Sequence, residues 1–169
     1  HLALSHPEVA LQFLNNGQEK LRTSGNGKLK DVIYQIYGRD VAANLIELDY
    51  EKGGLRITGF LGKPVITRGN RNFENFFVNG RYVKSGMISK ALEDAYRDFV
   101  MQHKFPFAVL HFHLNGEEVD INVHPTKMEL RFQKQQEVYG TVFEAVHRTL
   151  LEPELIQRAE VPEPVAVRM

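Results

Sequence analysis

One lysine of this sequence is placed where a single positive charge can be aimed in a defined direction. Apolar and polar residues alternate from Val119 to Val123, a period of two that predicts a half-buried strand. Pro125 has no amide hydrogen to donate and ends the strand, and strand-like residues resume at Leu130. Lys127 is therefore predicted to lie at a short, constrained turn between two strands. An ordinary surface lysine beside a tight turn fits the same pattern.

Two histidines and two carboxylates form a second candidate site, for a metal ion. The Asn-Gly dipeptide at 115–116 predicts a two-residue hairpin turn. The register of that hairpin pairs His113 with Glu118 and His111 with Asp120. Alternating histidines that face carboxylates could bind zinc. Ordinary cross-strand pairing explains the same residues, because side chains on a flat sheet rarely converge on one tetrahedral point, and we therefore predict no metal site.

Basic residues on either side of a predicted turn at 79–80 form a third candidate site: Arg68, Arg71, Arg81 and Lys84. A groove that contacts phosphates needs such residues, and so does any soluble loop, so the pattern leaves both explanations open. The sequence contains no glycine-rich phosphate cradle, no dinucleotide fingerprint and no nucleophile elbow. The residues alone therefore assemble no complete active site.

The composition is that of an ordinary soluble globular protein. Of the 169 residues 43% are hydrophobic and 25% charged, and Lys+Arg and Asp+Glu both number 21. Any surface for nucleic acid must therefore be a local patch. Cysteine is absent, which excludes disulfides and thiolate metal ligands. No apolar run approaches the roughly 18 residues of a membrane helix, and a start at His1 rather than Met leads us to expect a fragment of a longer protein.

The elements that position these residues are predicted in the order strands, helix, strands, helix, hairpin, helix. Strands are expected at 9–14, 19–23, 45–50, 55–61, 73–78, 81–83 and 107–114, and helices at 29–36, 87–99 and 135–151. The fold class is an α/β (α+β) sandwich, a mixed sheet with helices packed on it. Three prolines from residue 153 onward indicate a domain at 1–152 and the start of an interdomain linker at 153–169.

Two strand registers follow from the turns. A three-residue loop at 15–17 places Leu11 opposite Leu21. The Asn-Gly turn at 115–116 pairs the strand at 107–114 with the strand that leads to the lysine. The apolar pairs expected there are Phe112 with Val119, Leu110 with Ile121, and Ala108 with Val123.

Two segments together resemble the MutL family of DNA mismatch repair proteins: Phe77-Val78-Asn79-Gly80-Arg81 and the stretch from Val119 to Phe132. They match the family's VNGR turn and its Asp-(Ile/Val)-Asn-Val-His-Pro-x-Lys-x-Glu-(Leu/Val)-Arg-Phe signature, and the resemblance covers nearly the whole chain. It implies the second, or transducer, domain of that family, which follows an ATP-binding domain of the GHKL class. It also implies a fold like domain 2 of a small-subunit ribosomal protein, with a left-handed βαβ crossover, where the general rule predicts a right-handed one.

The same resemblance implies that Lys127 reaches the γ-phosphate of ATP bound in the preceding domain. A lysine is a compact charge on a long stem, which suits it to detecting a terminal phosphate. Its turn would be held by four neighbours: Asn122, His124, Pro125 and Thr126. ATP binding would then favour dimerisation of the full-length protein, and hydrolysis would reverse it. ATP and Mg²⁺ are expected in the parent and no cofactor in this fragment, which by itself is expected not to be an enzyme.

Further partners are implied by the resemblance: DNA bound without sequence preference, a MutS-type mismatch recogniser, and a second copy of the full-length protein. Arg68, Arg71, Arg81 and Lys84 are the candidate DNA contacts; near the start of the long helix, Gly86 occupies a position that the family uses for DNA. No membrane association is expected, and the location is cytoplasmic, on the nucleoid in a bacterium. The alternative is a stand-alone nucleic-acid-binding module on the same fold, with Lys127 only structural. An enzyme of related fold would need phosphate-binding motifs that are absent.

Overall fold

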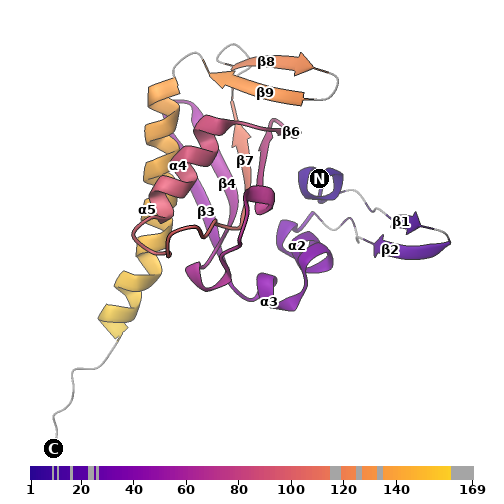
Figure 1. Ribbon diagram of the computed structural model, residues 1–169, viewed down its shortest axis with the longest axis horizontal. Coiled ribbons are helices and arrows are strands. Elements are labelled where there is room, and N and C mark those ends of the chain that lie inside the picture. Colours follow the sequence, from indigo (N-terminus) through magenta and orange to yellow (C-terminus); the bar gives the residue numbers. More distant parts are fainter. Residues whose placement is uncertain are drawn as a thin grey trace, which may run out of the picture.

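Five strands form one mixed sheet (Figure 1). The computed structural model describes residues 1–8, 10, 12–15, 17–22, 25, 27–114, 119–124, 127–132 and 135–160, with only the backbone at 2, 12–15, 18–22, 119–124, 127–132 and 153–160. The strands are β3 (Leu45–Lys52), β4 (Leu55–Gly62), β5 (Glu74–Val78), β6 (Arg81–Val83) and β7 (Ala108–His113), in the order β3-β4-β7-β5-β6. β5 and β7 run parallel and the other neighbours are antiparallel, which confirms the predicted mixed sheet.

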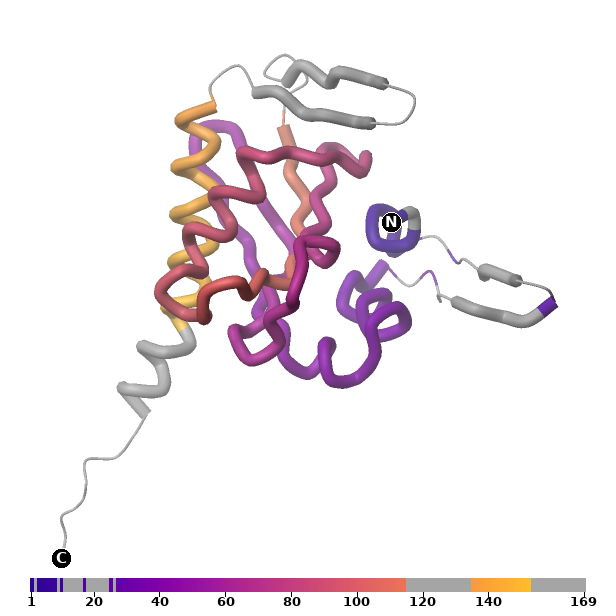
Figure 2. Tube along the Cα trace, in the orientation of Figure 1, coloured from indigo at the N-terminus to yellow at the C-terminus, as the bar shows by residue number. Residues whose placement is uncertain are grey.

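Helices cover both faces of this sheet (Figures 1 and 2). On one face lie α4 (Gly86–Tyr96) and α5 (Gln135–Glu160), and on the other α1 (Leu2–Ser5), α2 (Leu29–Tyr37) and α3 (Arg39–Ala42). Successive strand residues therefore enter different cores: Phe76 packs with the α4–α5 layer and Phe77 with the α1–α3 layer. Every residue of β5 is buried, as expected for a strand covered on both sides.

The crossover from β5 to β7 is left-handed. The chain leaves β5 through β6 and α4, and α4 lies nearer the viewer than the sheet in Figure 1. With β5 and β7 both pointing upward, β7 lies to the left of β5, toward β4. A helix in front and a second strand to the left define the rarer hand. Ser85 caps α4, because its Oγ accepts a hydrogen bond from the Ile88 amide at 3.1 Å.

The predicted pairing of the 107–114 strand with the lysine-bearing strand is wrong. β7 has β4 on one edge and β5 on the other, and a strand has only two edges. β8 (Val119–His124) pairs instead with β9 (Lys127–Phe132). Across that pair Val119 faces Phe132, Ile121 faces Leu130 and Val123 faces Met128. The apolar alternation that matched β7 is satisfied equally well by β9.

Two other predictions are corrected at the ends of the chain. β1 (Gln12–Asn15) and β2 (Gln18–Arg22) place Phe13, not Leu11, opposite Leu21. Asn15 already pairs with Gln18, which shifts the expected register by one residue, and a bulge between Phe13 and Leu14 shifts it by one more. α5 continues past Pro153 to Glu160, whereas the helix was expected to end near Leu151. Regular structure therefore extends into the expected linker, and the domain boundary at 152 stays a prediction. Within the described residues no helix is long and apolar enough to cross a membrane.

Candidate functional site

The lysine lies at the turn of a two-stranded hairpin. We call β8 and β9 together the lysine hairpin. Its register pairs His124 with Lys127, so Lys127 is the first residue of β9 and faces the last residue of β8. Asn122 pairs with Glu129 on the same face of the hairpin. The strand–turn–strand arrangement predicted from the sequence is therefore present, while Pro125 and Thr126 lie outside the described residues.

The lysine hairpin is not a member of the main sheet. It forms a separate two-stranded sheet, and its β9 strand lies against β6 and also contacts α5. β6 begins immediately after the turn formed by Asn79 and Gly80, whose φ angles of 47° and 84° are those of a type I′ turn. The predicted turn at 79–80 is confirmed, and it connects β5 to β6, the edge strand of the main sheet that lies beside the lysine hairpin.

The basic residues expected to bind DNA fall into two groups. Arg71 forms two hydrogen bonds with the Glu93 carboxylate at 2.7 and 3.0 Å, and its guanidinium lies over the Phe105 ring at 4.6 Å. Glu93 thereby raises the pKa of Arg71. Arg68 lies over the Phe73 ring at 4.8 Å, and its Nε is buried without a hydrogen-bond partner. Both arginines are engaged in contacts within the domain.

Arg81 and Lys84 belong to the second group. Both side chains are exposed, and within the described part of the chain neither has an ion pair or a hydrogen bond from its side chain. A cation without a protein partner remains available to a phosphate. The structure therefore separates the four candidates into two that make contacts within the domain and two whose side chains have no partner among the described residues.

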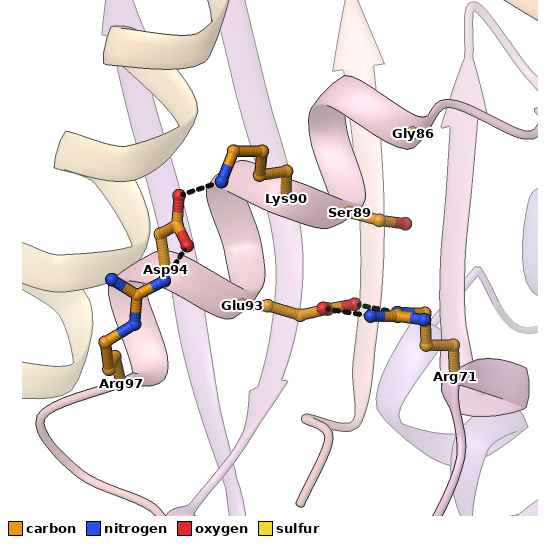
Figure 3. A pocket seen from close by; sticks show the side chains of 7 residues that line it. All are labelled: Arg71, Gly86, Ser89, Lys90, Glu93, Asp94 and Arg97. Atoms are coloured by element: carbon orange, nitrogen blue, oxygen red, sulfur yellow. Dashed lines mark hydrogen bonds and ion pairs between the residues drawn. The ribbon is translucent and has the colours of Figure 1, made fainter. Parts of the chain in front are cut away.

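A hollow runs along the exposed face of α4 (Figure 3). We call it the α4 groove; it is lined by Arg71, Gly86, Ser89, Lys90, Glu93, Asp94 and Arg97. An adjoining hollow shares Arg71, Gly86 and Ser89 with it and adds Lys84 and Glu74. The groove thus combines cations from η2 (Arg71–Phe73) and from α4 with the carboxylates that partly neutralise them.

Asp94 is the most heavily paired carboxylate of the α4 groove. It accepts bonds from Lys90 at 3.4 Å, from Arg97 at 2.5 Å and from the Tyr139 hydroxyl of α5. Burial opposes its ionisation, but the hydrogen bonds from Tyr139 and Lys90 outweigh it, and the pKa of Asp94 is lowered. Lys90 and Arg97 remain 70% and 73% exposed, so these ion pairs leave both cations open to solvent.

Glu74 is a buried carboxyl beside the groove. It is 7% exposed, and neither carboxyl oxygen has a hydrogen-bond partner. Burial, followed by the neighbouring Glu93 carboxylate, raises the pKa of Glu74 to about 9, although Ser89 and Arg71 act in the opposite direction. Glu74 is therefore protonated and neutral at pH 7, which removes the cost of a buried charge.

The histidines considered for a metal site lie in a different environment from the one predicted. His111 Nε2 lies 3.0 Å from the carbonyl oxygen of Leu4, and His113 Nε2 lies 3.1 Å from the Thr58 hydroxyl. Burial lowers the pKa of His111. Asp120 pairs with Arg131 on β9, and Glu118 lies outside the described residues. Among the residues whose positions are given, no three His, Asp or Glu side chains are grouped as metal ligands.

Residues 33–151 match the family described as DNA mismatch repair protein, C-terminal domain. The chain belongs to this family. The similar mismatch repair proteins MutL of Agathobacter rectalis and of Clostridium botulinum are 53% identical over 161 residues and 38% identical over 164 residues. The alignments cover 95% and 97% of this chain but 24% of each relative. This mismatch repair chain thus spans about a quarter of the length of its relatives, and the predicted resemblance is confirmed.

Solved structures show the same fold. The N-terminal domain of a DNA repair protein superposes with a TM-score of 0.76 at 18% identity, over 92% of this chain and 52% of that one. The 43K ATPase domain of Thermus thermophilus gyrase B superposes with a TM-score of 0.50 at 13% identity, over 92% of this chain and 47% of that one. The mismatch repair chain therefore shares its fold with a region of proteins whose names include an ATPase.

Sequence reasoning missed Lys90 and Arg97 of the α4 groove and Glu74 of the adjoining hollow. Lys90 and Arg97 follow Gly86 at four-residue and eleven-residue spacings, which places all three on one side of a helix, but the sequence analysis assigned Lys90 and Arg97 no role. Glu74 gave a usable signal, because a lone acid opens the apolar stretch that becomes β5. Its neighbours Ser89 and Glu93 belong to a distant helix, which local sequence does not reveal.

Proposed function

We propose that this mismatch repair chain detects the terminal phosphate of ATP in a MutL-type ATPase, and that Lys127 makes the contact. The register that places Lys127 opposite His124 at the end of two paired strands is the observation that carries the proposal. An ammonium group is a compact charge on a flexible stem, and the paired strands restrict the backbone beneath it. The hairpin thereby holds one positive charge at a defined place outside the main sheet.

The ATP itself is proposed to bind in a preceding GHKL-class domain of the same protein. The sequence of this chain contains no glycine-rich phosphate cradle, so its own residues suit one contact and not a nucleotide pocket. ATP and Mg²⁺ supply the phosphoryl chemistry in that domain, and Asn122, His124, Pro125 and Thr126 hold the turn that carries the lysine. By itself this chain neither binds nor hydrolyses ATP, and turnover by the isolated chain would contradict the proposal.

The contact acts as a switch because ATP has a γ-phosphate and ADP does not. A lysine that interacts with one nucleotide and not the other biases the relative orientation of the two domains. We propose that this bias controls the pairing of two full-length copies and the docking of a MutS-type recogniser on DNA, in the cytoplasm or on a nucleoid. DNA would be bound without sequence preference through exposed cations, of which Arg81 and Lys84 are free of partners in the described part of the chain.

The test is the ATPase activity of the full-length protein with Lys127→Ala. Removing one charge that stabilises the transferred phosphate is expected to lower kcat about 100-fold, with little change in ADP affinity. Lys127→Arg keeps the charge but not the shape and is expected to recover part of the activity. Lys63→Ala removes an exposed lysine elsewhere and serves as the control.

One result would replace this function by the alternative. If Lys127→Ala leaves kcat within twofold of the parent while charge reversal at Arg81 and Lys84 abolishes DNA binding, the chain is a nucleic-acid-binding module with a structural lysine. The observation that favours this alternative is the pair of exposed cations without described partners.

A further inference from the structure

We infer that Asn79 positions the lysine hairpin by clamping the end of β7, from which the chain continues to β8. The inference rests on the proposed function, since it assigns Asn79 to the placement of Lys127. Asn79 opens the Asn-Gly turn between β5 and β6, a motif to which the ATP contact itself gives no role.

Three hydrogen bonds join Asn79 to β7. Its backbone amide donates to the carbonyl of Phe112 at 2.9 Å, which extends the β5–β7 ladder by one residue. Its side-chain Nδ2 donates to the carbonyl of Leu114 at 3.0 Å, and its Oδ1 accepts from the Leu114 amide at 3.1 Å. One carboxamide therefore satisfies both backbone polar groups of Leu114, as a partner strand would.

Leu114 needs this partner because both neighbouring strands stop short of it. The β4 ladder reaches His113 through Arg56, and the β5 ladder reaches Phe112 through Val78. Leu114 lies one position beyond the last pair on the β4 edge and two positions beyond the last pair on the β5 edge. It is the final described residue before Val119 begins β8, so the clamp holds the point at which the chain leaves the sheet.

The backbone at position 79 accounts for the choice of asparagine. A φ of 47° lies in the left-handed region, which asparagine tolerates better than most residues do. Glycine also fits this turn but offers no side-chain bond, and aspartate offers acceptors without a donor. Asparagine combines the permitted conformation with one donor and one acceptor at the correct place.

The turn at 79–80 also lies next to β6, the strand that β9 of the hairpin contacts. β6 starts at Arg81, directly after the turn, and β9 lies against β6. The same turn therefore fixes Leu114 on one side and sets the start of the strand beside β9 on the other. Loss of the carboxamide frees Leu114 while leaving the turn itself intact.

The experiment compares Asn79→Gly and Asn79→Asp with the parent in the full-length protein. Asn79→Gly keeps the turn and removes both side-chain bonds, and it is expected to speed hydrogen exchange of the Leu114 amide roughly tenfold. It is also expected to lower the ATPase kcat about fivefold to twentyfold with KM for ATP unchanged. Asn79→Asp keeps the acceptor for the Leu114 amide and is expected to restore slow exchange. Asn44→Gly removes a side-chain bond to the Asp40 carbonyl elsewhere and should leave both readouts unchanged.

A cycle with Lys127→Ala distinguishes positioning from a general structural effect. In that background Asn79→Gly is expected to lower kcat less than twofold further, because the lysine it positions is gone. An equal loss in both backgrounds, or unchanged Leu114 exchange in Asn79→Gly, would overturn the inference. If Lys127→Ala has no effect on kcat, the proposed function fails. Faster exchange across 119–124 and 127–132 in Asn79→Gly then still supports the clamp, and unchanged exchange overturns it.

Discussion

The centre of the sheet and the lysine hairpin are held in place by different means. β5 and β7 pair with each other and each has a second strand on its outer edge, while helices bury both faces. The lysine hairpin pairs within itself, and its β9 strand contacts β6 and α5. Pairing on both edges fixes the position of a strand. A self-paired hairpin keeps its own geometry, but its position relative to the sheet depends on a few contacts.

This difference separates stability from signalling. Truncation of a side chain in the centre of the sheet is expected to destabilise the fold, because the side chains of these strands fill two cores at once. The hairpin can lose its lysine, or its attachment at Leu114, without exposing either core. Substitutions in the two regions should therefore change different measurements, and the predictions below run from the largest expected effect to the smallest.

Phe112→Ala is expected to destabilise the domain by about 3–5 kcal/mol. Phe112 is completely buried on β7 and packs edge to face with Phe76, their ring centres 6.3 Å apart. Lys127→Ala is expected to change the free energy of unfolding by less than about 0.5 kcal/mol. Urea denaturation followed by circular dichroism measures both. A loss of more than about 1 kcal/mol for Lys127→Ala would place the lysine among the structural residues and remove the contrast.

Local sequence predicts elements in this chain better than it predicts their partners. The turn at 79–80 is a short-range feature, and it was predicted. The pairing of β8 was mispredicted, because an alternating strand fits any alternating partner and the Asn-Gly dipeptide at 115–116 favoured its neighbour in sequence. The decisive fact, that β5 and β4 occupy both edges of β7, depends on residues more than thirty positions away.

The candidate site divides in the same way. The place of Lys127 at the end of a strand–turn–strand unit follows from the residues on either side of it. The engagement of Arg71 by Glu93 does not, since a 310 turn and a helix bring together residues far apart in sequence. The sequence gives the sign of a residue's charge but not the partner of that charge. It therefore could not show that Arg71 is paired while Lys84 is not.

Glu74→Gln is expected to stabilise the domain by about 1–3 kcal/mol at pH 7.5. The pKa of Glu74 is about 9 in the fold, against an ordinary value of 4.5. Between these values the folded state retains a proton that the unfolded state has released. The contribution of Glu74 to stability therefore falls as the pH rises from about 4.5 to about 9, and it is constant below that window. Glutamine has a similar shape and no charge to lose.

Denaturation of the parent and the variant at each pH isolates this effect. The lowered pKa of His111 costs stability as the pH falls, but it acts in both proteins and cancels in the difference. Glu47→Gln, an exposed carboxylate on β3, is the matched control and should show a flat difference. An equally flat difference for Glu74→Gln would mean that the carboxyl is solvated in the fold. It would also mean that the sheet centre is less sealed than its packing indicates.

The smallest expected change concerns DNA and tests whether free and engaged cations differ. Charge reversal of Arg81 and Lys84 to Glu in the full-length protein is expected to weaken DNA binding about tenfold at 0.1 M salt and to reduce the salt slope by about two. The same reversal at Arg39 and Lys63, exposed residues of α3 and of the segment after β4, makes an equal change in net charge and should have a much smaller effect. Arg71→Ala is expected to leave the slope nearly unchanged, because Glu93 already neutralises that guanidinium. Equal slopes for both double variants would show that net charge alone sets DNA binding, and a large change for Arg71→Ala would move the DNA path into the α4 groove.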